Sequence, residues 1–209
     1  MISITEPSFE RLAIDDMPER DRLEHVAEEI QKVLRVAYSR VFEQQRQPRL
    51  PAGTIRRELF DETKPERVRR QIKRMGEHMN DYHSVYWLNW VDEELVGLSK
   101  TSPLKPNRKF MPRSDYYLND IAVTDEGNGW GSALLEHALT EYPLDRRMLL
   151  DAYEGNDRAN SWFNKLGFEP VSPQAADLGF QIGQVVVPQI RMAAPWVGLV
   201  AERLSRNER

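Results

Sequence analysis

Residues 116–139 read YYLNDIAVTDEGNGWGSALLEHAL, a pattern that predicts a strand, a glycine-rich turn and a helix in direct succession. Glycines at 127, 129 and 131 let the backbone take positive φ angles and approach a ligand closely. The first helical turn after them has N–H groups without an intrahelical partner, at the positive end of the helix dipole. The segment therefore predicts either a tight structural connection or a site for a phosphate or diphosphate group.

Two well-known nucleotide-binding motifs do not fit this turn. A Rossmann fingerprint requires G-x-G-x-x-G near the start of a βαβ unit, whereas the spacing here is G-x-G-x-G and several elements precede it. A Walker loop requires a lysine before its Ser or Thr, and here Gly131 stands before Ser132.

The elements on either side are predicted from hydrophobic periodicity. Helices are expected from Asp15 or Asp16 to about Phe42, then over 65–79, 129–142 and 159–166, and the last dozen residues should be helical or frayed. Strands are expected over 9–14, 84–91, 95–100, 116–123, 148–153 and 184–192. This order predicts one α+β domain over 1–209, in which helices pack on a mixed sheet.

Composition excludes several kinds of chemistry. The 209 residues contain no cysteine, so disulfides, a thiolate nucleophile, cysteine-bound zinc and iron–sulfur clusters are ruled out. The net charge of −4 argues against a general nucleic-acid binder. No apolar run approaches the roughly 18 residues of a membrane span, and the acidic N-terminus is unlike a signal peptide. We therefore expect a cytoplasmic protein with no nucleic-acid or membrane partner.

The helix predicted over 65–79 carries a row of cations on one face. Its members are Arg67, Arg69, Arg70, Lys73 and Arg74. The row is either a solvated helix face or a patch for an anionic partner or cofactor.

Two segments together resemble the GNAT superfamily of N-acetyltransferases. The strand ends in the apolar-x-valine triplet Ile121–Ala122–Val123, and Gly129–Trp130–Gly131 matches the glycine turn of that family. The second segment, EGNDRANSWFNKLGFEPV over 154–171, matches the strand–helix module that follows in the family, through the residues Asn156, Ala159, Phe163, Gly167 and Phe168. The resemblance covers about residues 84–192, with 9–80 shaping the acceptor site and 196–209 forming a tail.

The resemblance implies a mostly antiparallel twisted sheet that binds acetyl-CoA at a splayed strand. The implied acetyl-CoA-binding residues are Ile121, Ala122, Val123, Glu126, Gly127, Asn128, Gly129, Trp130, Gly131, Ser132, Asn156, Ala159 and Phe163. Two departures stand out. Glu126 falls where the family has Gln or Arg, in a loop about two residues shorter than usual, so weaker CoA binding is expected. Phe163 stands where many members have a tyrosine that protonates the departing thiolate.

The family reaction needs a base for the acceptor amine, and three residues of the strand are candidates. Asp120 is a charge in an otherwise apolar strand, and it either binds the amine or forms a structural ion pair. Tyr117 should face away from Asp120 by strand alternation unless a bulge intervenes, and Asn119 should share the face of Tyr117. Tyr153 and Glu154 are further candidates. The four histidines show no metal-ligand spacing, so no metal is expected.

The resemblance leaves two functions open. The first is transfer of an acetyl group from acetyl-CoA to an amine of a small molecule, an amino acid or a peptide. The second is a non-catalytic module of the same fold that binds acyl-CoA as a sensor. An unrelated nucleotide binder is a third, weaker alternative. The loop at 103–114 is expected to help line the acceptor site, and the oligomeric state is open, a homodimer included.

Overall fold

The computed structural model describes residues 7–13, 15, 18–44, 65–103, 115–171, 179–182 and 185–207. Its strands are β1 (Ser8–Leu12), β2 (Val85–Val91), β3 (Glu94–Pro103), β4 (Tyr116–Val123), β5 (Met148–Tyr153), β6 (Glu169–Pro170), β7 (Gly179–Ile182) and β8 (Val185–Ala194). Its helices are α1 (Arg20–Gln44), α2 (Pro65–Tyr82), α3 (Trp130–Leu139), α4 (Asp157–Lys165) and α5 (Val197–Asn207).

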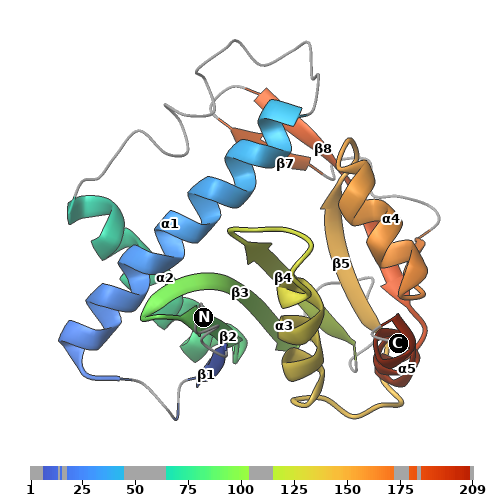
Figure 1. Ribbon diagram of the computed structural model, residues 1–209, viewed down its shortest axis with the longest axis horizontal. Helices are drawn as coiled ribbons and strands as arrows, with labels where there is room; N and C mark the ends of the chain where they lie inside the picture. Colours follow the sequence, from blue (N-terminus) through green and yellow to red (C-terminus); the bar gives the residue numbers. More distant parts are fainter. Residues whose placement is uncertain are drawn as a thin grey trace, which may run out of the picture.

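The strands form one eight-stranded sheet in the order β1-β2-β3-β4-β5-β8-β6, with β7 paired to β8 (Figure 1). Among the described strands, β4 and β5 are the one parallel pair, and every other neighbouring pair is antiparallel. The expected α+β class and mostly antiparallel sheet are thereby confirmed.

Several element boundaries differ from the sequence expectation. The first helix begins at Arg20 rather than at Asp15 or Asp16, and the N–H of Leu23 donates to the carbonyl of Glu19. Strands β6 and β7 were not expected, since both are too short for an alternating pattern. The segments 45–64 and 104–114, including most of the predicted loop at 103–114, lie outside the described residues.

Helices α1 and α2 cover one face of β1–β4. Their apolar faces meet the sheet in a core that contains Val26, Ile30, Met75, Met79, Leu88, Leu98 and Ala122. The outer face of α2 carries the exposed cations Arg69, Arg70, Lys73 and Arg74. Lys73 lies 3.7 Å from Glu77 on that same helix, as expected for a solvated face.

Helices α3, α4 and α5 pack on the other face: α3 lies against β2, β3 and β4, α4 lies against β5, and α5 lies against β8. This second core contains Leu118, Leu135, Met148, Leu150, Phe163, Phe168, Met192 and Val200. The C-terminal end of α1 reaches β8 across the sheet, where Phe42 contacts Val187 beside the half-buried Tyr38 and Tyr153 (Figure 1). Strand β4 therefore belongs to both cores, and the end of α1 lies over the strands β5 and β8.

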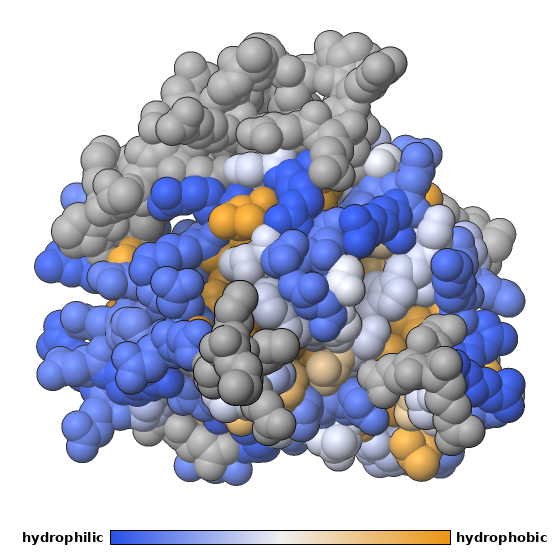
Figure 2. Space-filling view, in the orientation of Figure 1, coloured by the Kyte–Doolittle hydropathy of each residue, from blue (hydrophilic) through white to orange (hydrophobic). Residues whose placement is uncertain are grey.

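The visible surface is mostly hydrophilic, and its hydrophobic patches are small and separate (Figure 2). The large apolar residues that are exposed are Val36, Tyr82, Leu144, Val186 and Trp196. In the described part of the chain, no helix combines the length and the apolar character needed to cross a bilayer.

Candidate functional site

Strands β4 and β5 part after only three paired positions. Tyr116, Tyr117 and Leu118 pair with residues 148–150, whereas β4 continues to Val123 and β5 continues to Tyr153 without further pairing between them. Figure 1 shows the two strands diverging toward their C-terminal ends. Beyond Leu118, the edge of β4 that faces β5 therefore carries backbone N–H and C=O groups with no ladder partner, which can bind an inserted ligand.

A bulge in β4 brings Tyr117 and Asp120 to the same face of the sheet. Lys100 pairs with Asp120 and Thr101 pairs with Leu118, so Asn119 is the extra, unpaired residue. Such an inserted residue shifts the alternation of side chains by one position. The alternation expected for a strand without a bulge therefore does not apply here, because the bulge lies between these two residues and brings them to one face.

Asp120 is held by two partners on that face. Its Oδ2 lies 2.7 Å from Nζ of Lys100, and its Oδ1 accepts a hydrogen bond of 3.1 Å from the hydroxyl of Tyr38. The side chains of Asp120 and Lys100 are 26% and 12% exposed, so the ion pair is partly shielded from water. Both alternatives for Asp120 thus remain: a base at the strand opening and one half of an ion pair.

One buried tyrosine and two half-buried tyrosines lie near this carboxylate. Burial raises the pKa of Tyr38, Tyr86 and Tyr153, and the charge of Asp120 raises each pKa further. The rings of Tyr38 and Tyr153 are 6.2 Å apart in an edge-to-face arrangement. At neutral pH all three phenols are protonated, so they present hydrogen-bond donors beside Asp120.

His78 stands at the α2 side of the same cluster. Its Nδ1 is 3.5 Å from the hydroxyl of Tyr86, whose ring lies 5.9 Å from Nζ of Lys100. Burial lowers the pKa of His78, and the nearby charge of Lys100 lowers it further. A neutral imidazole is therefore favoured at this position.

Tyr117 belongs to a separate polar group on β5 and β8. Burial and the charge of Asp151 raise the pKa of Tyr117, and Asp151 makes a two-point ion pair with Arg191 at 2.8 Å and 2.8 Å. Asn119, the bulged residue, donates to Oγ of Ser102 at 2.8 Å and to the carbonyl of Tyr117 at 3.2 Å. Of the three predicted catalytic residues, Asp120 thus lies by the strand opening with Tyr38 and Tyr153, Tyr117 bonds elsewhere, and Asn119 holds the bulge.

The glycine turn gives α3 an open N-terminus. Gly127 and Gly129 have φ angles of +95° and +77°, which only glycine adopts without strain. Gly129 is the N-cap and supplies no side-chain hydrogen bond, so the first N–H groups of α3 lack a cap. A Cβ atom added at Gly131 would meet nothing within 4 Å, which leaves room for a ligand at the helix start.

The other residues of the turn have identifiable places. Asn128 donates to Oδ2 of Asp125 at 2.8 Å, which closes the turn. The side chain of Ala122 is buried beneath α1 and α2, whereas that of Ile121 packs toward the core on the other face. Trp130 and Ser132, in the first turn of α3, are half-buried.

Glu126 bonds two arginines from distant parts of the chain. Its Oε1 lies 3.4 Å from NH1 of Arg40 on α1, and its Oε2 contacts NH1 of Arg158 on α4. Arg40 also donates to the carbonyl of Thr124. The acid that looked unfavourable in the sequence is thus neutralised by two guanidinium groups.

Helix α4 is fixed at the C-terminal end of β5. The side chain of Asn156 caps it by accepting from the N–H of Ala159 at 3.2 Å, and Asn160 donates to the carbonyls of Tyr153 and Glu154. Phe163 is 5% exposed and packs edge-to-face on Phe168 in the core. The side chain of Phe163 therefore points into the core rather than toward the opening between β4 and β5, although its helix borders that opening.

Four residues of this region were not anticipated from the sequence: Lys100, Tyr38, Arg40 and Arg158. Each comes from an element outside residues 116–139, and Arg40 and Arg158 are joined through Glu126. One signal was available for Lys100, because a cation and an anion on neighbouring predicted strands suggest a cross-strand pair.

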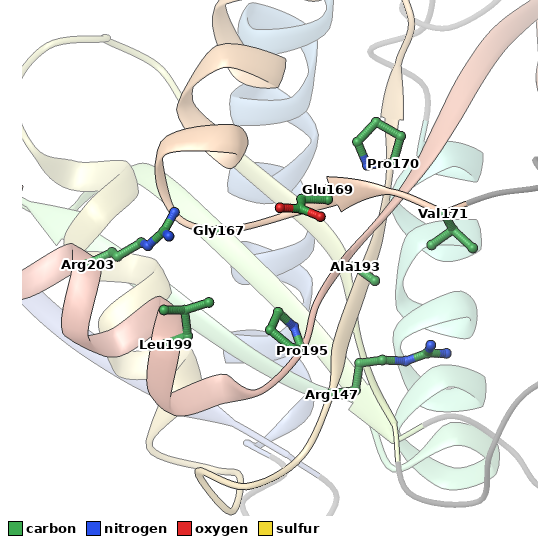
Figure 3. A pocket seen from close by; sticks show the side chains of 9 residues that line it. All are labelled: Arg147, Gly167, Glu169, Pro170, Val171, Ala193, Pro195, Leu199 and Arg203. Atoms are coloured by element: carbon green, nitrogen blue, oxygen red, sulfur yellow. The ribbon is translucent and has the colours of Figure 1, made fainter.

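The described part of the chain also has a pocket at the opposite end of β5. It is lined by Arg147, Gly167, Glu169, Pro170, Val171, Ala193, Pro195, Leu199 and Arg203 (Figure 3). Arg147 precedes β5 and is already paired with Asp115 at 2.7 Å, so the pocket is separate from the strand opening. Among the described residues, no three His, Cys, Asp or Glu side chains are grouped as metal ligands.

A known protein family matches the sequence of this chain, and solved structures match its fold. The model of the acetyltransferase (GNAT) family matches residues 53–168, which is more than half of the chain. No curated protein matches the sequence. The solved structures that share the fold include the following three, each of which covers at least 90% of this chain.

The first is the PaiA N-acetyltransferase of Thermoplasma acidophilum in complex with coenzyme A (12% identity, TM-score 0.58, covering 90% of this chain and 98% of that one). The second is the ribosomal-protein-S18-alanine N-acetyltransferase of Escherichia coli (14%, 0.55, 91% and 94%). The third is the histone acetyltransferase HPA2 and related acetyltransferase of Corynebacterium glutamicum (20%, 0.53, 91% and 96%). At these identities the likeness shows the fold alone.

Proposed function

The chain belongs to the GNAT family of acetyltransferases, and on that premise we propose that it moves an acetyl group from acetyl-CoA to a primary amine of a small molecule, amino acid or peptide. The observation that carries this proposal is the parting of β4 and β5 beside the uncapped start of α3. An opening between strands suits the extended pantetheine arm, and a bare helix start suits the diphosphate. Both features lie at the C-terminal end of β4.

The residues present fit acetyl-CoA. The N–H groups of the first turn of α3 point out of the helix start, and the open space at Gly131 would be reduced by any larger side chain. Gly127 and Gly129 hold the turn in a conformation that keeps these N–H groups together. These backbone groups supply the phosphate contacts that do not depend on the side chain at position 126.

Direct transfer accounts for the chemistry. The amine nitrogen forms a bond to the acyl carbon and the carbon–sulfur bond breaks. The nitrogen loses one proton and the departing CoA thiolate gains one, so the products are the acetylated amine and the free thiol of CoA. The amine must first be neutral, so a base removes its proton. Asp120 serves as that base or as the site that holds the ammonium, because its carboxylate lies at the face where β4 and β5 separate.

The remaining steps use groups already described. A backbone N–H near Val123, on the unpaired edge of β4, can stabilise the tetrahedral oxyanion. The hydroxyl of Tyr38 donates to Asp120 and so fixes the orientation of the carboxylate. Phe163 has no proton to give and is buried, so the thiolate takes its proton from another donor or from water.

One observation favours the second candidate, an acyl-CoA-binding module without turnover. Both carboxylate oxygens of Asp120 already have partners within the protein, Oδ2 with the ammonium of Lys100 and Oδ1 with the hydroxyl of Tyr38, so an acceptor amine would have to compete with them. The two candidates share the CoA site and differ only in the chemistry at Asp120.

Binding is tested first. Acetyl-CoA should raise the melting temperature of the full chain, and NADH and ATP should raise it less. Gly131→Glu should remove this shift by placing a carboxylate at the helix start. Gly76→Glu is the matched control, because a Cβ at Gly76 also meets nothing within 4 Å but lies on α2. A full shift in Gly131→Glu would show that the turn is not the CoA site.

Turnover is tested next, with acetyl-CoA, a panel of amines and a thiol-release assay. Release of CoA that depends on an amine supports the transferase. Binding of acetyl-CoA with no release for any amine class supports the acyl-CoA-binding module instead. Competition by ATP as strong as that by CoA would count against a site that is specific for CoA.

A further inference from the structure

Three charged side chains from three elements meet at the turn after β4. Arg40 comes from the C-terminal part of α1, Glu126 from the turn itself, and Arg158 from the first turn of α4. Each carboxylate oxygen of Glu126 has its own guanidinium partner, Oε1 with Arg40 and Oε2 with Arg158. Two guanidinium groups around one oxyanion are the arrangement with which proteins bind phosphate groups.

The group carries an excess of positive charge. Two guanidinium groups face one carboxylate, so the three side chains together carry one net positive charge. The start of α3 adds the partial positive charge of uncapped N–H groups three residues along the chain, and Arg158 itself lies in the first turn of α4. The surroundings of the Glu126 carboxylate therefore favour an anion at this place.

The three side chains differ in their freedom to move. The side chain of Arg158 is 67% exposed, that of Glu126 is 30% exposed, and that of Arg40 is 24% exposed. Arg40 is also anchored through its bond to the carbonyl of Thr124. Arg158 is therefore the most exposed of the three side chains, while Arg40 has a second bond that holds it in position.

We infer that Glu126 occupies the place of a CoA phosphate group in the free protein, and that Arg40 and Arg158 become ligands of the CoA diphosphate when it displaces this carboxylate. The inference rests on the proposed function, since it assigns side chains to the same CoA site. It explains how a turn with an acid beside its glycines can still accept a diphosphate. The positive charge comes from α1 and α4 rather than from position 126.

A resident carboxylate competes with the ligand. The apparent dissociation constant for CoA equals the intrinsic constant divided by the fraction of molecules in which Glu126 has released the arginines. Glu126→Gln removes the negative charge and frees both guanidinium groups, so it should tighten CoA binding by about three- to tenfold. Arg158→Gln should weaken CoA binding by about the same factor, because it removes a ligand of the bound state.

The experiment is a calorimetric titration of the full chain with CoA and, in parallel, with pantetheine, which has no phosphate. The variants are Glu126→Gln, Arg158→Gln and Arg40→Gln. The matched controls are Glu202→Gln and Arg206→Gln, which alter an exposed Arg–Glu pair on α5. Melting temperatures identify any variant that fails to fold; should Arg40→Gln be one, Arg158→Gln carries the arginine comparison alone.

The expected result is tighter CoA binding by Glu126→Gln, weaker CoA binding by Arg158→Gln, and unchanged pantetheine binding and unchanged controls. If the wild type binds CoA but Glu126→Gln binds it equally or more weakly, the inference is overturned while the proposed function stands. If neither the wild type nor Glu126→Gln binds CoA, the proposed function is overturned, and this inference with it. CoA binding that appears only in Glu126→Gln supports the inference.

Discussion

Replacing Lys100 by Met should destabilise the protein much less when Asp120 is replaced as well. The two side chains form an ion pair of 2.7 Å on adjacent strands and are 12% and 26% exposed. Removing either partner leaves a charge in a partly buried site, where water solvates it poorly. The double variant Lys100→Met/Asp120→Asn leaves neither charge.

The magnitude follows from the distance and the burial. Two unit charges about 4 Å apart attract each other by about 4 kcal/mol at the effective dielectric constant of about 20 found near protein surfaces. Desolvation of both groups offsets part of that attraction, so we expect a coupling energy of about 1–3 kcal/mol. Each single variant should lower the free energy of unfolding by about 2 kcal/mol.

Denaturant unfolding of the four proteins, followed by tryptophan fluorescence at pH 7, gives the coupling energy by linear extrapolation. Asp120→Asn retains an oxygen that can accept from Tyr38, so the cycle isolates the contribution of the charge. A coupling energy below about 0.5 kcal/mol would refute the reasoning, because it is the value of an ordinary exposed pair. Turnover of Asp120→Asn, measured below its melting temperature, should also fall at least about tenfold, and unchanged turnover removes Asp120 from the mechanism.

Three further predictions concern other parts of the fold. Gly97→Ala should lower the free energy of unfolding by about 1–3 kcal/mol, because its Cβ would lie 2.8 Å from Leu134 and 3.2 Å from the carbonyl of Ala122; a thermal melt checks this, and an unchanged melting temperature would contradict it. His78 has a lowered pKa in the folded state, so the unfolded chain binds its proton first and stability falls as the pH drops below about 6.5. His78→Gln should flatten the measured pH dependence of stability below about pH 6.5, and a slope unchanged by this substitution would disprove it. Five tyrosines (38, 86, 117, 142 and 153) have raised pKa values, so they should stay protonated at pH 10.5 and ionise only when alkali unfolds the protein. Absorbance at 295 nm follows their ionisation, and ionisation of these five side chains before unfolding would contradict the prediction.

The sequence predicted most of the sheet because its strands carry clear local patterns. The strands over 116–123 and 148–153 have the bounds expected from their apolar runs, and the three glycines marked the start of α3. Helix boundaries were less certain, as α1 shows: several acids precede it, and the residue that starts it depends on how the chain enters the helix.

The bulge at Asn119 could not be predicted, because an inserted residue leaves no mark on a strand whose two faces are both partly buried. Only the register against β3 shows that Tyr117 and Asp120 share a face. The partners of Glu126 were equally hidden, since Arg40 and Arg158 reach it from helices 86 positions before and 32 positions after it in the chain. Such contacts depend on tertiary packing rather than on local periodicity.

The separation of β4 and β5 also affects the local opening motions of the molecule. Three paired positions join two parts of the sheet, β1–β4 covered by α1 and α2, and β5 with β8 covered by α4 and α5. Amide protons on the edges where β4 and β5 separate should therefore exchange with solvent sooner than those inside either part. A ligand bound between β4 and β5 would join the two parts of the sheet, so it should slow amide exchange on both strands and couple the motions of the two parts.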